Sequence, residues 1–281
     1  MTVKIVTDST SDLSSEMAGE LGITVVPLYV YLGKESYRDG VDLTTEEFYR
    51  KLERSETLPT TSVPPVASFT QAYDKLAEET DEILVITISH KLSATYETAS
   101  NAVELMKRKC RVEVIDSLTV LMAQGLIVIA AAKAANAGVS LDEVVKITRQ
   151  NIPRSEVRMT LDTLEYLKRG GRIGKAQAFI GSILKVNPII GIKDAEVHPF
   201  ARTRSRAKAI DYLYNFAAGF SHIEEMAVED ATTPDEADML VERLSSKFPR
   251  ERIYRSKVGS VIGTHVGPHV LGVCVLGDRQ G

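Results

Sequence analysis

Residues 82–88 read Glu82-Ile83-Leu84-Val85-Ile86-Thr87-Ile88, a nearly continuous run of β-branched and other apolar side chains. Such a run is typical of a strand that is buried on both faces of a parallel sheet. Parallel strands are joined by crossover connections, usually helices, which cover the faces of the sheet. The run therefore predicts an α/β fold with helices on both faces of a parallel sheet.

The segments on either side of this run repeat the order strand, polar turn, helix. Val3–Asp8 predicts a strand that leads through a polar cluster into a helix at Ser14–Leu21, and Val112–Ser117 predicts a strand followed by a long helix from Leu118. This alternation predicts an α/β lobe with right-handed crossovers over residues 1 to about 154. Other elements expected in this lobe are a strand at Ile23–Leu32, helices at Thr44–Arg54, Val66–Thr80 and Leu141–Asn151, and an extended proline-rich loop at Leu58–Pro65.

Beyond about residue 155 the pattern changes to short strands mixed with helices. Pro188–Ile192 and Glu196–Phe200, joined by a turn at Lys193–Ala195, predict a β-hairpin. Helices at about Ser205–Ala218 and Pro234–Lys247 alternate with further strands. We therefore expect a second lobe, of α+β character, over residues 155–281. The other strands expected there are Val157–Leu161, Met226–Glu229, Arg252–Ser256 and Val270–Leu276.

Composition limits the classes of protein to which the chain can belong. Of its 281 residues 44% are hydrophobic, and its net charge of −4 lacks the basic excess of nucleic-acid-binding proteins. A strand pattern begins at Val3 with no signal-peptide pattern before it, so we expect a cytoplasmic protein. The most apolar run, Val120–Ala132, is shorter than the roughly 20 residues of a membrane-spanning helix and predicts a buried helix. Cys110 and Cys274 have no zinc-site spacing and are expected to be reduced structural thiols.

Three clusters of hydroxyl side chains follow expected strands or loops: Asp8–Ser11, Thr60–Ser62, and Ser89 with Ser93. In open α/β sheets, ligands bind beyond the carboxyl ends of the strands, where helix N-termini favour an anion. Ordinary helix caps use the same residue types, so any one cluster is equally well explained as a cap. Convergence of the clusters in space would favour a site for an anionic head group.

Other motifs leave more than one interpretation open. The loop at Gly170–Lys175 lacks the spacing of a phosphate-binding loop and is better explained as a glycine turn whose cations dock against the other lobe. His265 lies among glycines at Gly263–His269, where it either reaches a ligand or the facing lobe, or makes a structural hydrogen bond in a turn. Arg202 belongs to an alternating series of arginines that is either solvated or a partner-docking patch.

Taken together, the motifs along nearly the whole chain resemble the DegV family of bacterial fatty-acid-binding proteins. The resemblance rests on the order and spacing of several segments. Two positions depart from the pattern common in the family, His269 after Pro268 and Ala94 after Ser93. The segments that carry the resemblance are Thr7–Leu13, Pro59–Ser62, Ile88–Ala99, Val114–Ser117, Leu161–Gly174 and Gly263–Pro268.

The resemblance implies a two-lobed α/β protein, spanning residues 1–281, that encloses one long-chain fatty acid such as palmitate in an apolar tunnel. It implies that Thr61 and Ser93 hold the carboxylate, with Ser62 and His265 close to it. The carrier itself would perform no catalysis and need no cofactor. It would present the acid to a separate ATP-dependent fatty-acid kinase for acyl-phosphate formation, with the region of Arg202 facing that kinase.

Two other classes of function stay open on the residues alone. A serine-dependent acyl hydrolase or acyltransferase would use Ser93 as the nucleophile, with His265 and an aspartate, although no G-x-S-x-G motif is present. A regulatory interaction protein would hold its lipid as a structural plug that no kinase could reach. Turnover of acyl esters, and exchange of the bound lipid, distinguish these classes from a carrier.

Overall fold

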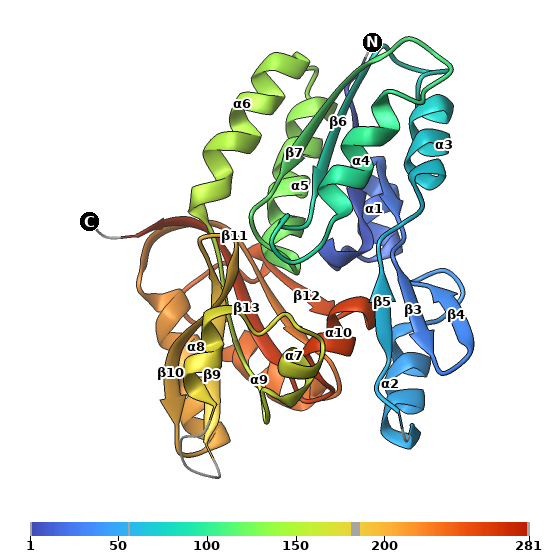
Figure 1. Ribbon diagram of the computed structural model, residues 1–281. Helices are drawn as coiled ribbons and strands as arrows, with labels where there is room; N and C mark the ends of the chain where they lie inside the picture. Colours follow the sequence, from blue (N-terminus) through green and yellow to red (C-terminus); the bar gives the residue numbers. More distant parts are fainter. Residues whose placement is uncertain (1, 56, 181–185, 280–281) are drawn as a thin grey trace.

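A parallel sheet forms the centre of the first half of the chain. The computed structural model describes residues 2–55, 57–180 and 186–279. The strands of the first sheet run in the order β2-β1-β6-β7, all parallel (Figure 1). This arrangement confirms the α/β fold predicted from the run at residues 82–88. The strands are β1 (Lys4–Asp8), β2 (Ile23–Val26), β6 (Glu82–Thr87) and β7 (Arg111–Asp116).

Helices cover both faces of this sheet, as the apolar run in β6 requires. Leu84 and Ile86 pack in one hydrophobic cluster with α5 and α6, while Ile83 and Val85 pack in another with α3 and α4. Alternate side chains of a strand point to opposite faces, so a strand covered on both sides must be apolar throughout. The helices of this half are α1 (Ser15–Leu21), α3 (Val66–Leu76), α4 (Thr95–Val103), α5 (Met122–Asn136) and α6 (Leu141–Asn151).

A small antiparallel sheet extends from the first sheet and corrects two expectations. Residues 23–32 do not form one strand: β2 ends at Val26 before Pro27, and β3 (Tyr29–Leu32) joins a separate sheet of order β4-β3-β5. The proline-rich loop likewise contains a short strand, β5 (Thr60–Ser62), whose Thr61 pairs with Val30. The remaining elements here are β4 (Glu35–Arg38) and α2 (Thr45–Arg54).

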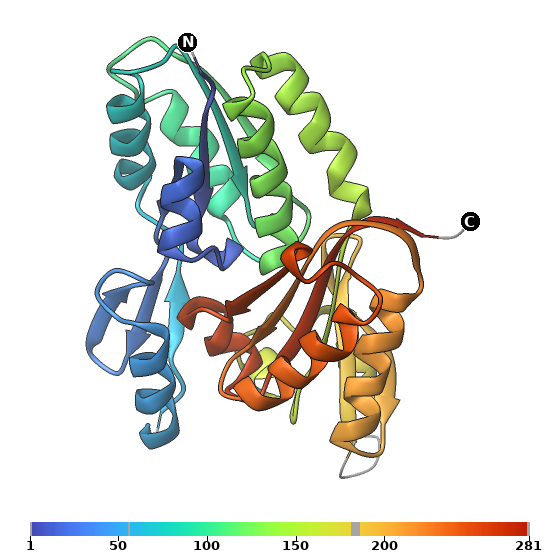
Figure 2. The same ribbon diagram turned by 180° about the vertical axis from the view of Figure 1, so that it is seen from behind.

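The second half of the chain is built on a six-stranded mixed sheet of order β10-β9-β8-β13-β11-β12. The predicted hairpin is present as β9 and β10, and helices α8 and α9 cover one face (Figure 2). The strands are β8 (Ser155–Thr160), β9 (Asn187–Lys193), β10 (Glu196–Thr203), β11 (Phe220–Asp230), β12 (Ile253–Lys257) and β13 (Leu271–Arg279). The helices are α7 (Glu165–Arg169), α8 (Arg206–Ala218), α9 (Pro234–Ser245) and α10 (Ser260–Val266).

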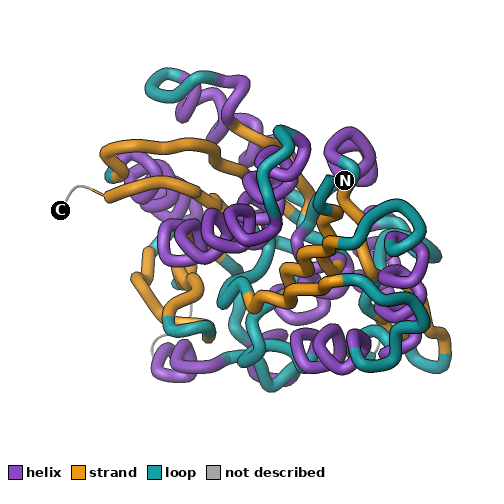
Figure 3. Tube along the Cα trace, turned by 90° about the horizontal axis from the view of Figure 1, so that it is seen from above, coloured by secondary structure: helices purple, strands orange, loops and turns teal. Residues whose placement is uncertain are grey.

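Helix α5 lies where the two halves meet (Figure 1). The view from above shows helices lying beside the strands (Figure 3). We call the elements from β1 to residue 154 the N-lobe and those from β8 onward the C-lobe. Residues 121–129 are all buried, because α5 packs against β1 and β6 of the N-lobe and against β8, β11 and β13 of the C-lobe. Burial on every side explains an apolar run without an amphipathic period. No helix within the described ranges is long and apolar enough to cross a membrane.

One segment expected as a turn is a helix. Gly263, Thr264 and His265 belong to α10, which lies between the C-lobe sheet and β5 in Figure 1. Short 3₁₀ turns complete the described secondary structure. They are η1 (Ser9–Ser11), η2 (Ile152–Arg154), η3 (Gly174–Phe179) and η4 (Arg250–Arg252).

Candidate functional site

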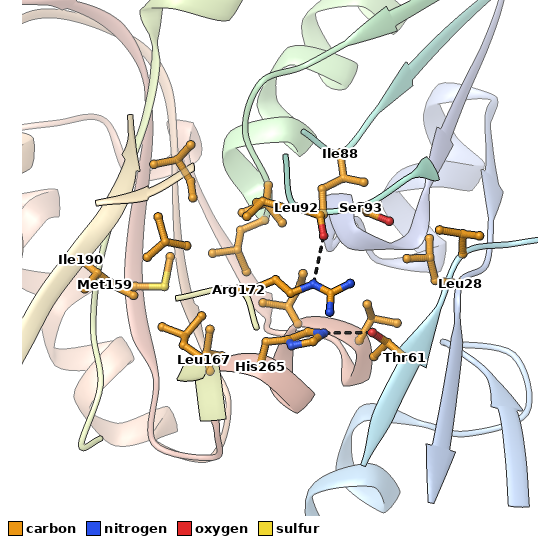
Figure 4. A pocket seen from close by; sticks show the side chains of 18 of the residues that line it. Leu28, Thr61, Ile88, Leu92, Ser93, Met159, Leu167, Arg172, Ile190 and His265 are labelled. Carbon is orange, nitrogen blue, oxygen red and sulfur yellow. Dashed lines mark hydrogen bonds between the residues drawn. The ribbon is translucent and has the colours of Figure 1, made fainter. Parts of the chain in front are cut away.

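A pocket lies between the two lobes (Figure 4). It leaves about 670 Å³ free of protein atoms, a volume that includes its opening to solvent. Small-molecule sites are usually concave and mostly apolar. Its apolar wall comes from both lobes: Leu28, Val63, Ile88, Leu92, Val120 and Leu121 on one side, and Met159, Leu167, Ile190, Ile192, Val197, Val261, Ile262 and Val266 on the other.

The polar side chains of the pocket include four predicted site residues. Thr61, Ser62, Ser93 and His265 all line it, and only Arg172 adds a charge to the lining that the structure describes. Thr61 and His265 share a hydrogen bond of 2.9 Å between Oγ1 and Nε2. These two residues lie 204 positions apart, so the packing of α10 against β5 brings them together.

Ser93 reaches the pocket from the turn that follows β6. Its backbone N–H donates to the Ser89 carbonyl over 3.1 Å, which closes the turn, and its hydroxyl lies 2.8 Å from the Thr95 hydroxyl at the start of α4. Ser62 points differently: its Oγ lies 3.3 Å from the Tyr31 hydroxyl on the neighbouring strand. Ser93 and Thr61 therefore offer hydroxyls from two different elements of the N-lobe.

His265 is a neutral imidazole at physiological pH. Burial of the ring and the nearby positive charge of Arg172 lower the pKa of His265 to about 4. Its Nδ1 is buried and has no hydrogen-bond partner among the residues that the structure describes. Gly170 packs directly on the ring, where a Cβ would lie 2.3 Å from Nδ1. A neutral imidazole has one N–H, and from Nε2 it can donate to Thr61 Oγ1 and leave the Thr61 hydroxyl proton for a ligand.

Arg172 was not predicted as a site residue. Its guanidinium bridges the lobes, with Nε donating to the Leu92 carbonyl over 3.2 Å and Nη1 to the Gly170 carbonyl over 2.7 Å. The prediction that this glycine turn docks against the other lobe is therefore confirmed. The sequence feature that could have indicated Arg172 as a site residue is the basic, glycine-rich loop. Nothing in the sequence indicated that this loop faces Thr61 and Ser93.

The other hydroxyl clusters have structural roles. Asp8 accepts hydrogen bonds from the Thr10 N–H over 3.0 Å and the Ile88 N–H over 2.8 Å, so the first cluster caps η1 and ties β1 to β6. Ser89 donates to the Ala195 carbonyl over 2.6 Å and so joins the two lobes. Of the three clusters, only Thr61, Ser62 and Ser93 supply hydroxyls to the pocket.

Arg202 does not line the pocket. It lies exposed on β10, where its Nη2 donates to the Ala178 carbonyl over 3.0 Å and its guanidinium stacks 4.1 Å from the centre of the Phe179 ring. Its proposed contact with a partner stays a prediction.

The fold and the site together define an α/β binding protein whose apolar pocket, with hydroxyls, an imidazole and one cation, lies between two lobes. Comparison with known proteins identifies the group. The family model described as "Uncharacterised protein, DegV family" matches residues 2–278. A DegV domain-containing protein of Clostridium perfringens is 36% identical over 97% of this chain and 98% of its own. The chain belongs to the DegV family.

Solved structures extend this comparison. A DegV family protein from Thermus thermophilus, described by its fatty-acid binding, has a TM-score of 0.90 and 35% identity over 99% of this chain and 100% of its own. The DegV fatty-acid-binding protein of Bacillus subtilis has a TM-score of 0.89 and 34% identity over the same shares. A stearic-acid-binding protein from Eubacterium ventriosum has a TM-score of 0.88 and 27% identity over 98% of each chain.

Proposed function

We propose that this protein binds one long-chain fatty acid in the pocket between its lobes. The carboxylate would accept hydrogen bonds from the hydroxyls of Thr61 and Ser93, with His265 orienting the Thr61 hydroxyl through Nε2, and the acyl chain would lie along the apolar wall. The observation that carries the proposal is the juxtaposition of a long apolar lining with a single polar group of residues contributed by both lobes. The fatty-acid binding of two relatives at 34–35% identity supports it.

The acyl chain and the carboxylate of such a ligand would each be stabilised by a different part of this pocket. Burying an alkyl chain contributes roughly 0.8 kcal/mol per methylene, so about fourteen methylenes offer on the order of 11 kcal/mol before the costs of ordering. A buried carboxylate needs donors, because leaving it without hydrogen bonds costs several kcal/mol. The Thr61 and Ser93 hydroxyls are such donors, and the Arg172 charge lowers the cost further.

The finer part of the proposal is that the protein presents the acid to a separate ATP-dependent kinase. The bound carboxylate would attack the γ-phosphorus of ATP on that enzyme and yield an acyl phosphate and ADP. Hydroxyl donors hold the carboxylate without a tight ion pair, which leaves an oxygen free to react. Arg172 is exposed although it lines the pocket, so a protein partner could approach the head group from this side. The resemblance of the whole chain to DegV proteins supports this role.

Native mass spectrometry of the purified protein tests the binding proposal, followed by denaturing extraction and identification of any released molecule. We expect one fatty acid per chain. A protein that is empty and takes up no added long-chain fatty acid would refute the proposal. In parallel, turnover of a p-nitrophenyl acyl ester that the substitution Ser93→Ala abolishes would assign the pocket to a hydrolase instead.

A further inference from the structure

Helix α10 belongs to the C-lobe in sequence but docks into the N-lobe. It contacts α2, β3, β5 and η1 of the N-lobe, whereas α7 is its main contact within the C-lobe. Val261, Ile262, His265 and Val266 of this helix line the pocket. The position of α10 relative to the N-lobe therefore decides where His265 meets Thr61.

Two buried carboxylates of the N-lobe hold the first residues of α10. Asp39 Oδ1 accepts hydrogen bonds from the Ser260 N–H over 3.1 Å and from the Ser260 hydroxyl over 2.5 Å. Asp12 Oδ1 accepts the N–H of Gly259 over 3.1 Å. Asp39 is only 6% exposed. Carboxylates with several donors form the stronger class of hydrogen bond.

Close packing fixes the rotation of the same helix. The Tyr49 hydroxyl on α2 donates to the Val258 carbonyl over 2.9 Å, just before α10 begins. A Cβ on Gly263 would lie 2.4 Å from the Tyr49 hydroxyl oxygen and 2.8 Å from the Phe48 ring. The helix backbone thus rests directly on α2 and cannot turn without a clash. A short helix held in this way transmits a shift at its first residue to its last turn.

We propose that Asp39 is a positioning residue for the fatty-acid head group: by holding Ser260 it fixes α10, and α10 holds His265 against Thr61. Asp39 itself does not line the pocket. The expected effect on stearate affinity rests on the proposed function. The expected effect on the position of His265 concerns the protein without ligand. A hydrogen bond tolerates displacements of only a few tenths of an ångström, so a small shift of α10 weakens the bond between His265 and Thr61.

The test compares Asp39→Ala, Asp39→Asn and the control Asp42→Ala. Asp42 lies three residues further on and makes an exposed ion pair with Arg38. Stearate affinity is measured by calorimetry, and the His265 ring is followed by NMR on ¹⁵N-histidine-labelled protein, with His265→Gln used to assign its signal among the five histidines.

In ligand-free protein we expect Asp39→Ala to raise the pKa of His265 from about 4 toward 6.5, because the ring becomes more exposed to solvent. It should weaken stearate binding about tenfold, the effect of losing one head-group hydrogen bond. Asp39→Asn keeps an acceptor for Ser260 and should recover most of both properties. Asp42→Ala should leave both unchanged.

The outcomes distinguish the positioning role of Asp39 from the proposed fatty-acid binding. A folded Asp39→Ala protein with unchanged His265 titration and stearate affinity would overturn the positioning role. If the wild-type protein binds no stearate while Asp39→Ala still alters His265, the positioning role stands and the proposed function fails. Should Asp39→Ala not fold, Ser260→Ala removes only one of the donors to Asp39, and an unmoved His265 signal in that variant would refute the proposal.

Discussion

Glu229 on β11 makes the stability of the protein depend on pH. The side chain is fully buried, and burial raises its pKa to about 7. Both of its oxygens accept the Met122 N–H over 3.2 Å, and Oε1 accepts the Cys274 thiol over 2.9 Å. Asp12 approaches from the N-lobe, and burial together with the negative charge of Glu229 raises its pKa as well. The two carboxyl groups titrate as a pair across the lobe interface.

The direction of the effect follows from proton linkage. An unfolded chain releases the Glu229 proton near pH 4.5, whereas the folded protein keeps it up to about pH 7. Between these values the folded state binds more protons, so the free energy of unfolding falls as pH rises. At about 1.4 kcal/mol per pH unit, the fall across this window amounts to about 3 kcal/mol.

Substitution of Glu229 by Gln removes this dependence, because the amide keeps a neutral acceptor for Met122. We expect the free energy of unfolding in urea, taken as Glu229→Gln minus wild type, to rise by about 3 kcal/mol between pH 5 and pH 8. The lowered pKa of His265 makes stability rise with pH up to about 6.5, but both proteins contain it, so it cancels in the difference. Glu20→Gln on the exposed face of α1 is the matched control. A difference that stays constant with pH would refute the raised pKa of the Glu229–Asp12 pair.

Three further predictions concern the pocket and α10. Thr61→Ala should weaken stearate binding about tenfold without unfolding the protein, whereas Thr61→Ser keeps the hydroxyl and should bind normally; a collapsed melting transition would mean a structural role. Across a series of saturated acids, each added methylene should lower Kd about fourfold until the chain fills the pocket, and a flat series in calorimetry would contradict apolar burial. Gly263→Ala should destabilise the protein by about 1–3 kcal/mol because its Cβ would meet Tyr49. Gly19→Ala, in an open position on α1, should instead raise stability by up to about 1 kcal/mol in the same urea titration.

Local patterns were sufficient to predict most elements of the fold. The apolar run in β6 and the apolar residues 121–129 at the start of α5 indicate their own burial by composition, because both stretches are covered on all sides. The hairpin of β9 and β10 depends on a short turn and on alternating side chains, which are also local. The break at Pro27 was missed because the strand pattern on either side is continuous. β3 leaves the first sheet because it pairs with β4 and with β5, which lies about 30 residues further along the chain.

The glycines around His265 show why its helix was not predicted. Gly259, Gly263 and Gly267 are typical of a turn in the sequence, since glycine weakens a helix. In the structure each one permits a close contact: with Asp12, with Tyr49 and with the Tyr166 ring, respectively. The helix is stabilised by these tertiary contacts, so no local signal could indicate it.

By itself the sequence determined the fold class and the pool of hydroxyl and imidazole side chains that a carboxylate-binding site needs. Hydrophobic periodicity is a pattern of a few neighbouring residues, so it can be recognised in the sequence. The polar clusters that follow β6 and precede α3 are local patterns of the same kind. Only the tertiary structure decided which of these residues meet. Thr61 and His265 face each other because α10 crosses from the C-lobe to β5, and Arg172 joins them because its loop docks on Leu92. Such contacts depend on how the lobes pack, which no short stretch of sequence encodes.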